Sequence, residues 1–211
     1  MDPRRYIERA NDLLDEGRYE GAAAGFNAAA HGWLMRVYDL DSETGSIYTS
    51  PQNFGLFADY SLAAILCYRL VESKRVPFLR EQVQSIVKEF QQFEIPHSNL
   101  WYPAHQGLCD EILGDVVIYS GESGAIEHYD AAFKIYENTE NHLGWQSEFE
   151  FDFLIQPPVS LADQVGVELT QRKREEVTRT DLCSRISWKK EYLSEIIRDT
   201  LAQGEIKRGI F

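Results

Sequence analysis

Apolar residues recur at three- and four-residue spacing along most of this chain, a pattern that predicts a succession of amphipathic helices. Asp2-Pro3 predicts the start of the first helix, because aspartate accepts hydrogen bonds from free helix amides and proline has the backbone angle of the first helical position. We expect this helix to end at Gly17 and an alanine-rich second helix to occupy residues 19–40. The two segments predict an αα-hairpin whose small residues let the helices approach closely.

The middle of the chain continues this helical pattern. Residues 41–50 are polar and predict a loop, and Ser50-Pro51 then predicts the start of a long apolar helix that ends near Ser73. Residues 78–93 carry apolar side chains at helical spacing and predict a further amphipathic helix.

A second hairpin and a change of period follow. Apolar faces within residues 108–117 and 125–136 predict two helices joined by a turn at residues 120–124. In residues 148–153 acidic and aromatic side chains alternate strictly, which predicts a strand. Pro157-Pro158 ends this strand and predicts a domain boundary, after which helical character resumes.

The charge of the chain is acidic and unevenly distributed. Its 211 residues are enough for one sizeable domain or two small ones, and the formal net charge of -13 argues against a protein that binds nucleic acid or anionic membranes over its whole surface. Residues 171–211, however, contain ten basic against seven acidic side chains. We therefore predict two domains, residues 1–156 and residues 157–211.

Cysteine content and hydropathy bear on the cellular compartment. Cys67, Cys109 and Cys183 are odd in number and form no CxxC pair, so neither a disulfide framework nor a zinc ribbon is predicted. The longest apolar run, residues 62–68, is too short to cross a bilayer, and we expect a cytoplasmic protein without membrane contact. The acidic composition, with more Arg than Lys, also resembles that of halophilic archaeal proteins.

The first predicted hairpin carries small and aromatic residues at regular spacing. They are Tyr6, Ala10 and Leu13 before the turn, Gly17 and Tyr19 at the turn, and Ala22, Phe26 and Ala29 after it. In this pattern residues 6–34 resemble a tetratricopeptide repeat, and residues 109–136 resemble it more weakly, with a turn one residue shorter. The resemblance implies a mostly α fold of stacked αα-hairpins that binds a partner. The alternative is an irregular α-bundle in which these residues serve packing alone.

The same region has a second resemblance. Residues 13–22, followed by the alanine-rich helix, are similar to the opening of HEPN helical bundles. Active members of that group carry an Arg followed four to six residues later by His, and this sequence lacks that pattern. The resemblance therefore implies an inactive HEPN-like bundle.

The end of the chain has its own pattern. Apolar positions line up across two predicted helices, residues 181–186 and 188–203, and an extended end follows. This arrangement resembles a winged helix-turn-helix. The resemblance implies DNA binding through the second helix, where Lys189, Lys190 and Arg198 are the candidates for contacts with phosphates or base edges. The alternative is a terminal helix whose basic face packs on the acidic body.

Patterns typical of catalytic and metal sites are scarce. No HExxH, GxGxxG, GxxxxGK[ST] or GxSxG sequence occurs. His105 and Cys109 lie one helical turn apart beside Asp110 and Glu111, but two good ligands do not make a metal site. We therefore predict no catalytic residue, no metal and no cofactor.

The sequence as a whole favours a non-enzymatic adaptor that holds a protein or peptide between its helical hairpins. Tyr19, Phe26, Trp33 and Trp101 are the candidate partner-binding residues, because aromatic side chains are frequent anchors in interfaces. The acidic body favours a partner with basic residues. The alternatives are a transcriptional regulator whose residues 157–211 bind DNA, and an inactive HEPN-like bundle.

Overall fold

The described part of the chain is built mainly of α-helices. The computed structural model describes residues 2–40, 47–49, 51–92, 102–143, 156–169 and 182–208. In chain order its elements are α1 (Pro3–Asp15), α2 (Tyr19–Leu34), β1 (Tyr38–Leu40), β2 (Ile47–Thr49), α3 (Pro51–Leu70), α4 (Val76–Gln92), α5 (Tyr102–Ser120), α6 (Ala125–Leu143), α7 (Gln156–Val165), α9 (Leu182–Trp188), the π-helical segment η1 (Lys189–Leu193) and α10 (Ser194–Arg208). The predicted mostly α fold class is confirmed. None of these described helices is both long and apolar enough to cross a membrane.

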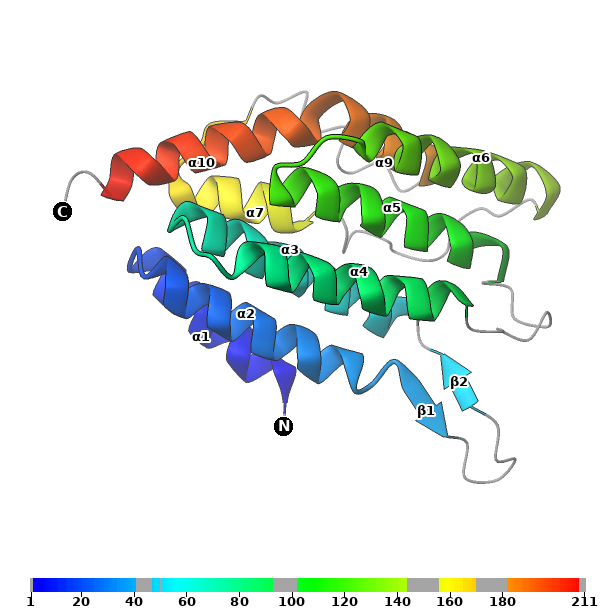
Figure 1. The fold of residues 1–211 in the computed structure, drawn as a ribbon, viewed down its shortest axis with the longest axis horizontal. Coiled ribbons are helices and arrows are strands. Elements are labelled where there is room, and N and C mark those ends of the chain that lie inside the picture. The colour runs from blue at the N-terminus through cyan, green and yellow to red at the C-terminus, as the bar shows by residue number, and fades with distance from the viewer. Residues whose placement is uncertain are drawn as a thin grey trace.

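The helices follow one another in antiparallel pairs. The pairs α1–α2, α3–α4 and α5–α6 lie in order across the molecule (Figure 1). Beyond them, α9 packs on α6, while α10 packs on α3, α5 and α7. The last described helix therefore contacts elements from several parts of the chain.

The first hairpin forms as predicted. Asp2 is the N-cap of α1, and its Oδ1 accepts a hydrogen bond from the amide of Arg4 over 3.2 Å. Gly17 has a φ of 71° in the turn, a left-handed conformation that glycine adopts without strain. Gly25 of α2 faces Ala10 of α1, where an added Cβ atom would come within 2.9 Å of the Ala10 Cβ. Small residues thus permit the close approach of α1 and α2.

The prediction that the second helix extends to residue 40 is wrong. α2 ends at Leu34, and Tyr38–Leu40 instead pairs in antiparallel fashion with Ile47–Thr49. Part of the predicted loop at residues 41–50 is therefore strand. Aromatic and β-branched residues in these two short runs favour extended backbone, which here outweighs the helical pattern that precedes them.

The start of α7 also differs from the prediction. The helix begins at Gln156, so Pro157 and Pro158 lie in its first turn rather than before it. Proline is tolerated there because the first amides of a helix have no acceptor within the helix. The predicted strand at residues 148–153 lies outside the described residues.

The C-terminal segment is one continuous helix rather than two separated ones. α9, η1 and α10 follow one another without a turn, so the predicted break near residue 187 and the predicted extended backbone after Gly204 are wrong for the described residues. Gly204 lies inside α10 and packs closely against α3. An added Cβ atom there would collide with the Leu70 side chain. The winged-helix resemblance stays a prediction.

One hydrophobic core runs through the described residues. Ile196 and Ile197 of α10 belong to the same buried cluster as Ala10 of α1 and Phe54 of α3. The described residues on the two sides of the predicted boundary at residues 156 and 157 therefore share a core. The division into two domains stays a prediction.

Candidate functional site

Four charged side chains meet in the interior where α9 and η1 approach α5. Glu111 and Asp115 lie one turn apart on α5, and Arg185 and Lys189 lie one turn apart on α9 and η1. Arg185 donates to both carboxylate oxygens of Glu111, from Nε over 2.7 Å and from Nη2 over 2.5 Å. The Nζ of Lys189 lies 2.7 Å from Oε1 of Glu111 and 2.5 Å from Oδ2 of Asp115. The two positive and two negative groups therefore compensate each other.

Two tyrosines of α6 complete this charge network. The Tyr136 hydroxyl donates to Oε2 of Glu111 over 2.8 Å, and the Tyr129 hydroxyl donates to Oδ1 of Asp115 over 2.7 Å. The Tyr129 ring lies against Gly114 of α5, where an added Cβ atom would come within 2.7 Å of the ring. Because only glycine leaves this space, the sequence of α5 determines how closely α6 approaches the carboxylates.

Burial and neighbouring charges act in opposite directions on the two carboxyl groups. Burial favours protonation of Glu111, but the Arg185 and Lys189 charges together outweigh it and hold the pKa of Glu111 at about 2. For Asp115, burial outweighs the Lys189 charge and, with the negative Glu111 nearby, raises the pKa to about 6. Glu111 is thus the firmly ionised member, and Asp115 is the member that takes up a proton in mild acid.

The charge network is suited to fixing the position of helices. Its four charged residues and two tyrosines each expose at most 2% of their surface, so no reactive group faces solvent. Lys189 is also the first residue of η1, and π-helical turns of this kind are rare and frequent near functional sites. We infer that the network holds η1, and with it the start of α10, against α5.

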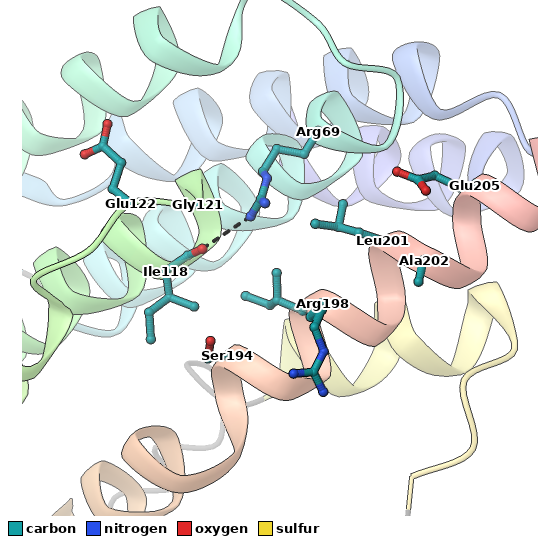
Figure 2. Close-up of a pocket in the computed structure, with 10 residues that line it drawn as sticks. Arg69, Ile118, Gly121, Glu122, Ser194, Arg198, Leu201, Ala202 and Glu205 are labelled. Atoms are coloured by element: carbon teal, nitrogen blue, oxygen red, sulfur yellow. Dashed lines mark hydrogen bonds between the residues drawn. The ribbon is translucent and has the colours of Figure 1, made fainter.

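A groove with a volume of about 500 Å³ lies beside α10 (Figure 2). Its lining comes from α10, the end of α3, the end of α5 and the turn after α5. The lining residues are Arg69, Ile118, Gly121, Glu122, Ser194, Ile197, Arg198, Leu201, Ala202 and Glu205. The six from α10 recur at three- and four-residue spacing, so a single face of this helix forms one wall. The apolar side chains of this lining are those of Ile118, Ile197, Leu201 and Ala202.

Charged side chains share the lining of the groove with these apolar residues. Glu122 forms an ion pair with Arg80 of α4, which compensates its charge. Arg198 is exposed, and its Nη2 lies 3.3 Å from Oδ1 of the adjacent Asp199. Glu205 is also exposed and lies about two helical turns after Arg198 on the same face of α10. The groove therefore combines apolar residues with charges of both signs.

Arg69 of α3 lines the groove and caps the C-terminal end of α5. Its Nη1 donates to the main-chain oxygen of Ile118 over 3.3 Å (Figure 2). The same atom donates to the main-chain oxygen of Tyr119 over 2.9 Å. These carbonyls lie in the last turn of α5, where the Ile118 oxygen also accepts a hydrogen bond from the Gly121 amide over 3.0 Å. A positive charge is favourable at this end of a helix. Partial burial lowers the pKa of Arg69.

A second hollow, of about 490 Å³, lies between α6 and the junction of α9 with η1. It is lined by Asp130, Phe133, Lys134, Ser187, Lys190 and Glu191. The Nζ of Lys190 lies 2.5 Å from Oδ1 of Asp130, so an ion pair joins the two helices at this place. The hollow thus lies beside an ion pair that joins η1 to α6.

The structure gives two of the predicted partner-binding residues a packing position. Tyr19 and Phe26 are buried, with exposed fractions of 3% and 4%. Trp33 is partly buried, and the Arg36 guanidinium lies 5.3 Å from the centre of its ring. Trp101 lies outside the described residues. Partner binding by these four residues stays a prediction.

The three residues predicted for contacts with DNA have different surroundings. Lys189 is enclosed in the charge network, so contact with a phosphate would require the network to open. Lys190 is paired with Asp130, whereas Arg198 is exposed at the groove. DNA binding by these residues stays a prediction.

His105 and Cys109 lie in the core. The Nε2 of His105 lies 2.9 Å from the main-chain oxygen of Phe90, and burial lowers the pKa of this imidazole. Burial also raises the pKa of the Cys109 thiol. Within the part of the chain that the structure describes, no group of three or more His, Cys, Asp or Glu side chains is arranged to hold a metal ion.

The sequence analysis did not predict the charge network or the groove. A signal for the network is present, because an acidic pair and a basic pair each occur at four-residue spacing on otherwise apolar helix faces. The groove leaves no comparable signal, since its lining comes from segments far apart in the sequence. Comparison with family models, with curated protein sequences and with solved structures finds no match to this chain.

Proposed function

We propose that this protein is a non-enzymatic adaptor that binds a short amphipathic segment of a partner protein in the groove beside α10. The observation that carries the proposal is the face of α10 that lines the groove, on which apolar residues are interspersed with Arg198 and Glu205. Recognition of a helix in a groove uses anchors at the same three- and four-residue spacing.

The size and composition of the groove support this proposal. Its volume of about 500 Å³ is of the order found for binding pockets, roughly 300–1,000 Å³. Ile118 and Leu201, which are only partly buried, offer apolar surface to a side chain of the partner. The described lining includes a single hydroxyl, that of Ser194, and no His or Cys, a composition that favours binding over nucleophilic catalysis.

The charge network supports the same role. A binding groove needs walls that keep their shape, because ordering a mobile wall would cost free energy at each binding event. Glu111 and Asp115 hold Lys189, which is five residues before Ser194 at the start of the groove wall. The network therefore lies where it can keep the α10 wall in place.

Selection from a library of random short peptides displayed on phage tests the proposal. The full chain is the bait, and the affinity of each selected peptide is then measured for two variants. Ala202→Arg places a long side chain in the groove, and we expect it to weaken binding by roughly tenfold or more. Ile206→Arg is the matched control, because Ile206 is 58% exposed on the same helix and does not line the groove.

The supporting result is a set of peptides that lose affinity for Ala202→Arg and keep it for Ile206→Arg. The proposal is wrong if no peptide is selected, or if the selected peptides bind Ala202→Arg as tightly as the unaltered chain.

A further inference from the structure

Arg69 differs from the other charged residues of the groove in its surroundings. Its described hydrogen bonds go to the neutral main-chain oxygens of Ile118 and Tyr119. Among the described residues it has no carboxylate partner, whereas Glu122 is paired with Arg80. Within the described ranges, the positive charge of Arg69 in the groove wall thus has no ion-pair partner.

The geometry of Arg69 leaves donors for a ligand. A guanidinium has five N–H donors in a planar fork, and the two described hydrogen bonds both start from Nη1. Nη2 lies at the turn after α5, 2.9 Å from where a Cβ atom of Gly121 would be. The guanidinium thus packs closely on Gly121, and Arg69 contributes to the lining of the groove.

The environment of Arg69 favours a carboxylate over a neutral group. Part of its hydration is lost to burial, which is also why its pKa is lowered. A carboxylate that approaches such a guanidinium forms shorter and stronger hydrogen bonds than a neutral acceptor, because both partners are charged. The apolar surface of Ile118 and Leu201 lies in the same groove and would take an apolar side chain of the same ligand.

We propose that the groove recognises an acidic side chain, Asp or Glu, of the partner peptide through Arg69, with an apolar side chain of the peptide packed on Ile118 and Leu201. This inference rests on the proposed function and specifies the chemistry of the partner. Only the peptide residue that contacts Arg69 needs to be acidic. Glu205, further along α10, favours a basic residue at that end of the same peptide, in accord with the acidic charge of the whole chain.

A double-mutant cycle between protein and peptide tests the inference. The probes are synthetic copies of the selected peptides and copies in which each Glu is replaced by Gln or each Asp by Asn. On the protein side, the variants are Arg69→Gln and Arg69→Lys, with Arg18→Gln as control, because Arg18 lies in the turn between α1 and α2 and is exposed. Substitution of Arg69 also removes its hydrogen bonds to the end of α5. The Glu→Gln or Asp→Asn exchange on the peptide leaves the protein unchanged, so its effect on affinity is free of this structural change.

We expect the peptide exchange to weaken binding to the unaltered chain by roughly tenfold and to have little effect on binding to Arg69→Gln. Arg69→Lys should restore part of the loss, because lysine keeps the charge and lacks the planar fork. Arg18→Gln should behave as the unaltered chain does.

The inference is wrong if the selected peptides lack an acidic residue, or if the peptide exchange weakens binding equally with and without Arg69. Either result leaves the proposed function standing as long as Ala202→Arg still blocks binding. Peptides that are insensitive to Ala202→Arg contradict the proposed function itself.

Discussion

Glu111 is a carboxylate in the protein interior that accepts hydrogen bonds from Arg185 and from the Tyr136 hydroxyl and lies 2.7 Å from Lys189 Nζ. Such a group stabilises the fold only as long as every partner is present, since removal of one charge leaves the opposite charge buried and uncompensated. Because Glu111 contacts both cations, it is the residue on which the charge network depends most.

Replacement of Glu111 by Gln should therefore lower the free energy of unfolding by about 3–5 kcal/mol. Gln has nearly the same shape, so the loss reflects charge rather than a cavity. Chemical denaturation measures it. Glu127→Gln is the control, because Glu127 is exposed on α6, and it should change stability by less than about 0.5 kcal/mol. Equal effects of the two substitutions would count against the network.

Asp115 makes stability depend on pH in a direction that is unusual for a carboxylate. Its pKa is about 6 in the folded chain against an ordinary value of 3.8, so the folded state binds the proton more tightly. Ionised Asp115 therefore costs stability above pH 6, and this cost disappears as the pH falls towards 4. Glu111 behaves in the opposite way: with a folded pKa of about 2, its contribution is lost only as the pH falls below about 4.5.

Denaturation of the unaltered chain and of Asp115→Asn between pH 7 and pH 4.5 separates these contributions. The unaltered chain should gain stability relative to the variant as the pH falls, on the order of 2 kcal/mol, since one pKa unit corresponds to about 1.4 kcal/mol. The folded pKa of Asp115 is not raised if the difference between the two proteins is constant over this interval.

At the scale of the elements, α5 and α6 approach closely because glycines face tyrosine rings. Gly107 faces the ring of Tyr136 as Gly114 faces that of Tyr129. Both tyrosines carry their hydroxyls to a buried carboxylate, so the distance between the helices and the geometry of the charge network are linked.

The substitution Gly114→Ala tests this packing through the sign of its effect. In an open helix, alanine is about 1 kcal/mol more favourable than glycine. Here the added methyl group would collide with the Tyr129 ring, so we expect a loss of about 1–3 kcal/mol. Thermal unfolding measures the change, and an increase in stability would show that the two helices are free to separate.

The sequence predicted those elements whose causes are local. Asp2 as a cap, Gly17 in a turn and the apolar faces of the second hairpin depend on neighbouring residues, and the structure confirms them. The end of α2 and the continuous helix from α9 to α10 depend on pairing and packing with distant segments. Gly204 illustrates the difference: it is a helix breaker by local preference and a contact with Leu70 in the fold.

The candidate site was largely hidden from sequence analysis for the same reason. The winged-helix resemblance implies that Lys189 contacts DNA, and the alternative is that the basic face of the terminal helix packs on the acidic body. In the fold Lys189 faces Glu111 and Asp115, which are 74 or more residues earlier in the chain. A pair of acids and a pair of bases at matching spacing is a signal for such a network only when the two helices are known to be neighbours.

At the scale of the whole molecule, the shared core predicts how the chain unfolds. Buried residues of α10 pack in the same cluster as those of α2 and α3, and a domain with one core usually unfolds in one cooperative step. Native-state hydrogen exchange should therefore give similar opening free energies for the most protected amides of α2 and α10. A much lower value for α10 would favour the two separate domains predicted from the sequence.

The central claim is that the groove beside α10 binds the partner. NMR spectra of the isotope-labelled full chain, recorded while a phage-selected peptide is added, test this claim most directly. We expect the largest chemical-shift changes at residues 118–122 and 194–205, which line the groove. Changes centred on the first hairpin or on the hollow beside Phe133 would contradict the claim, as would a spectrum that the peptide leaves unchanged.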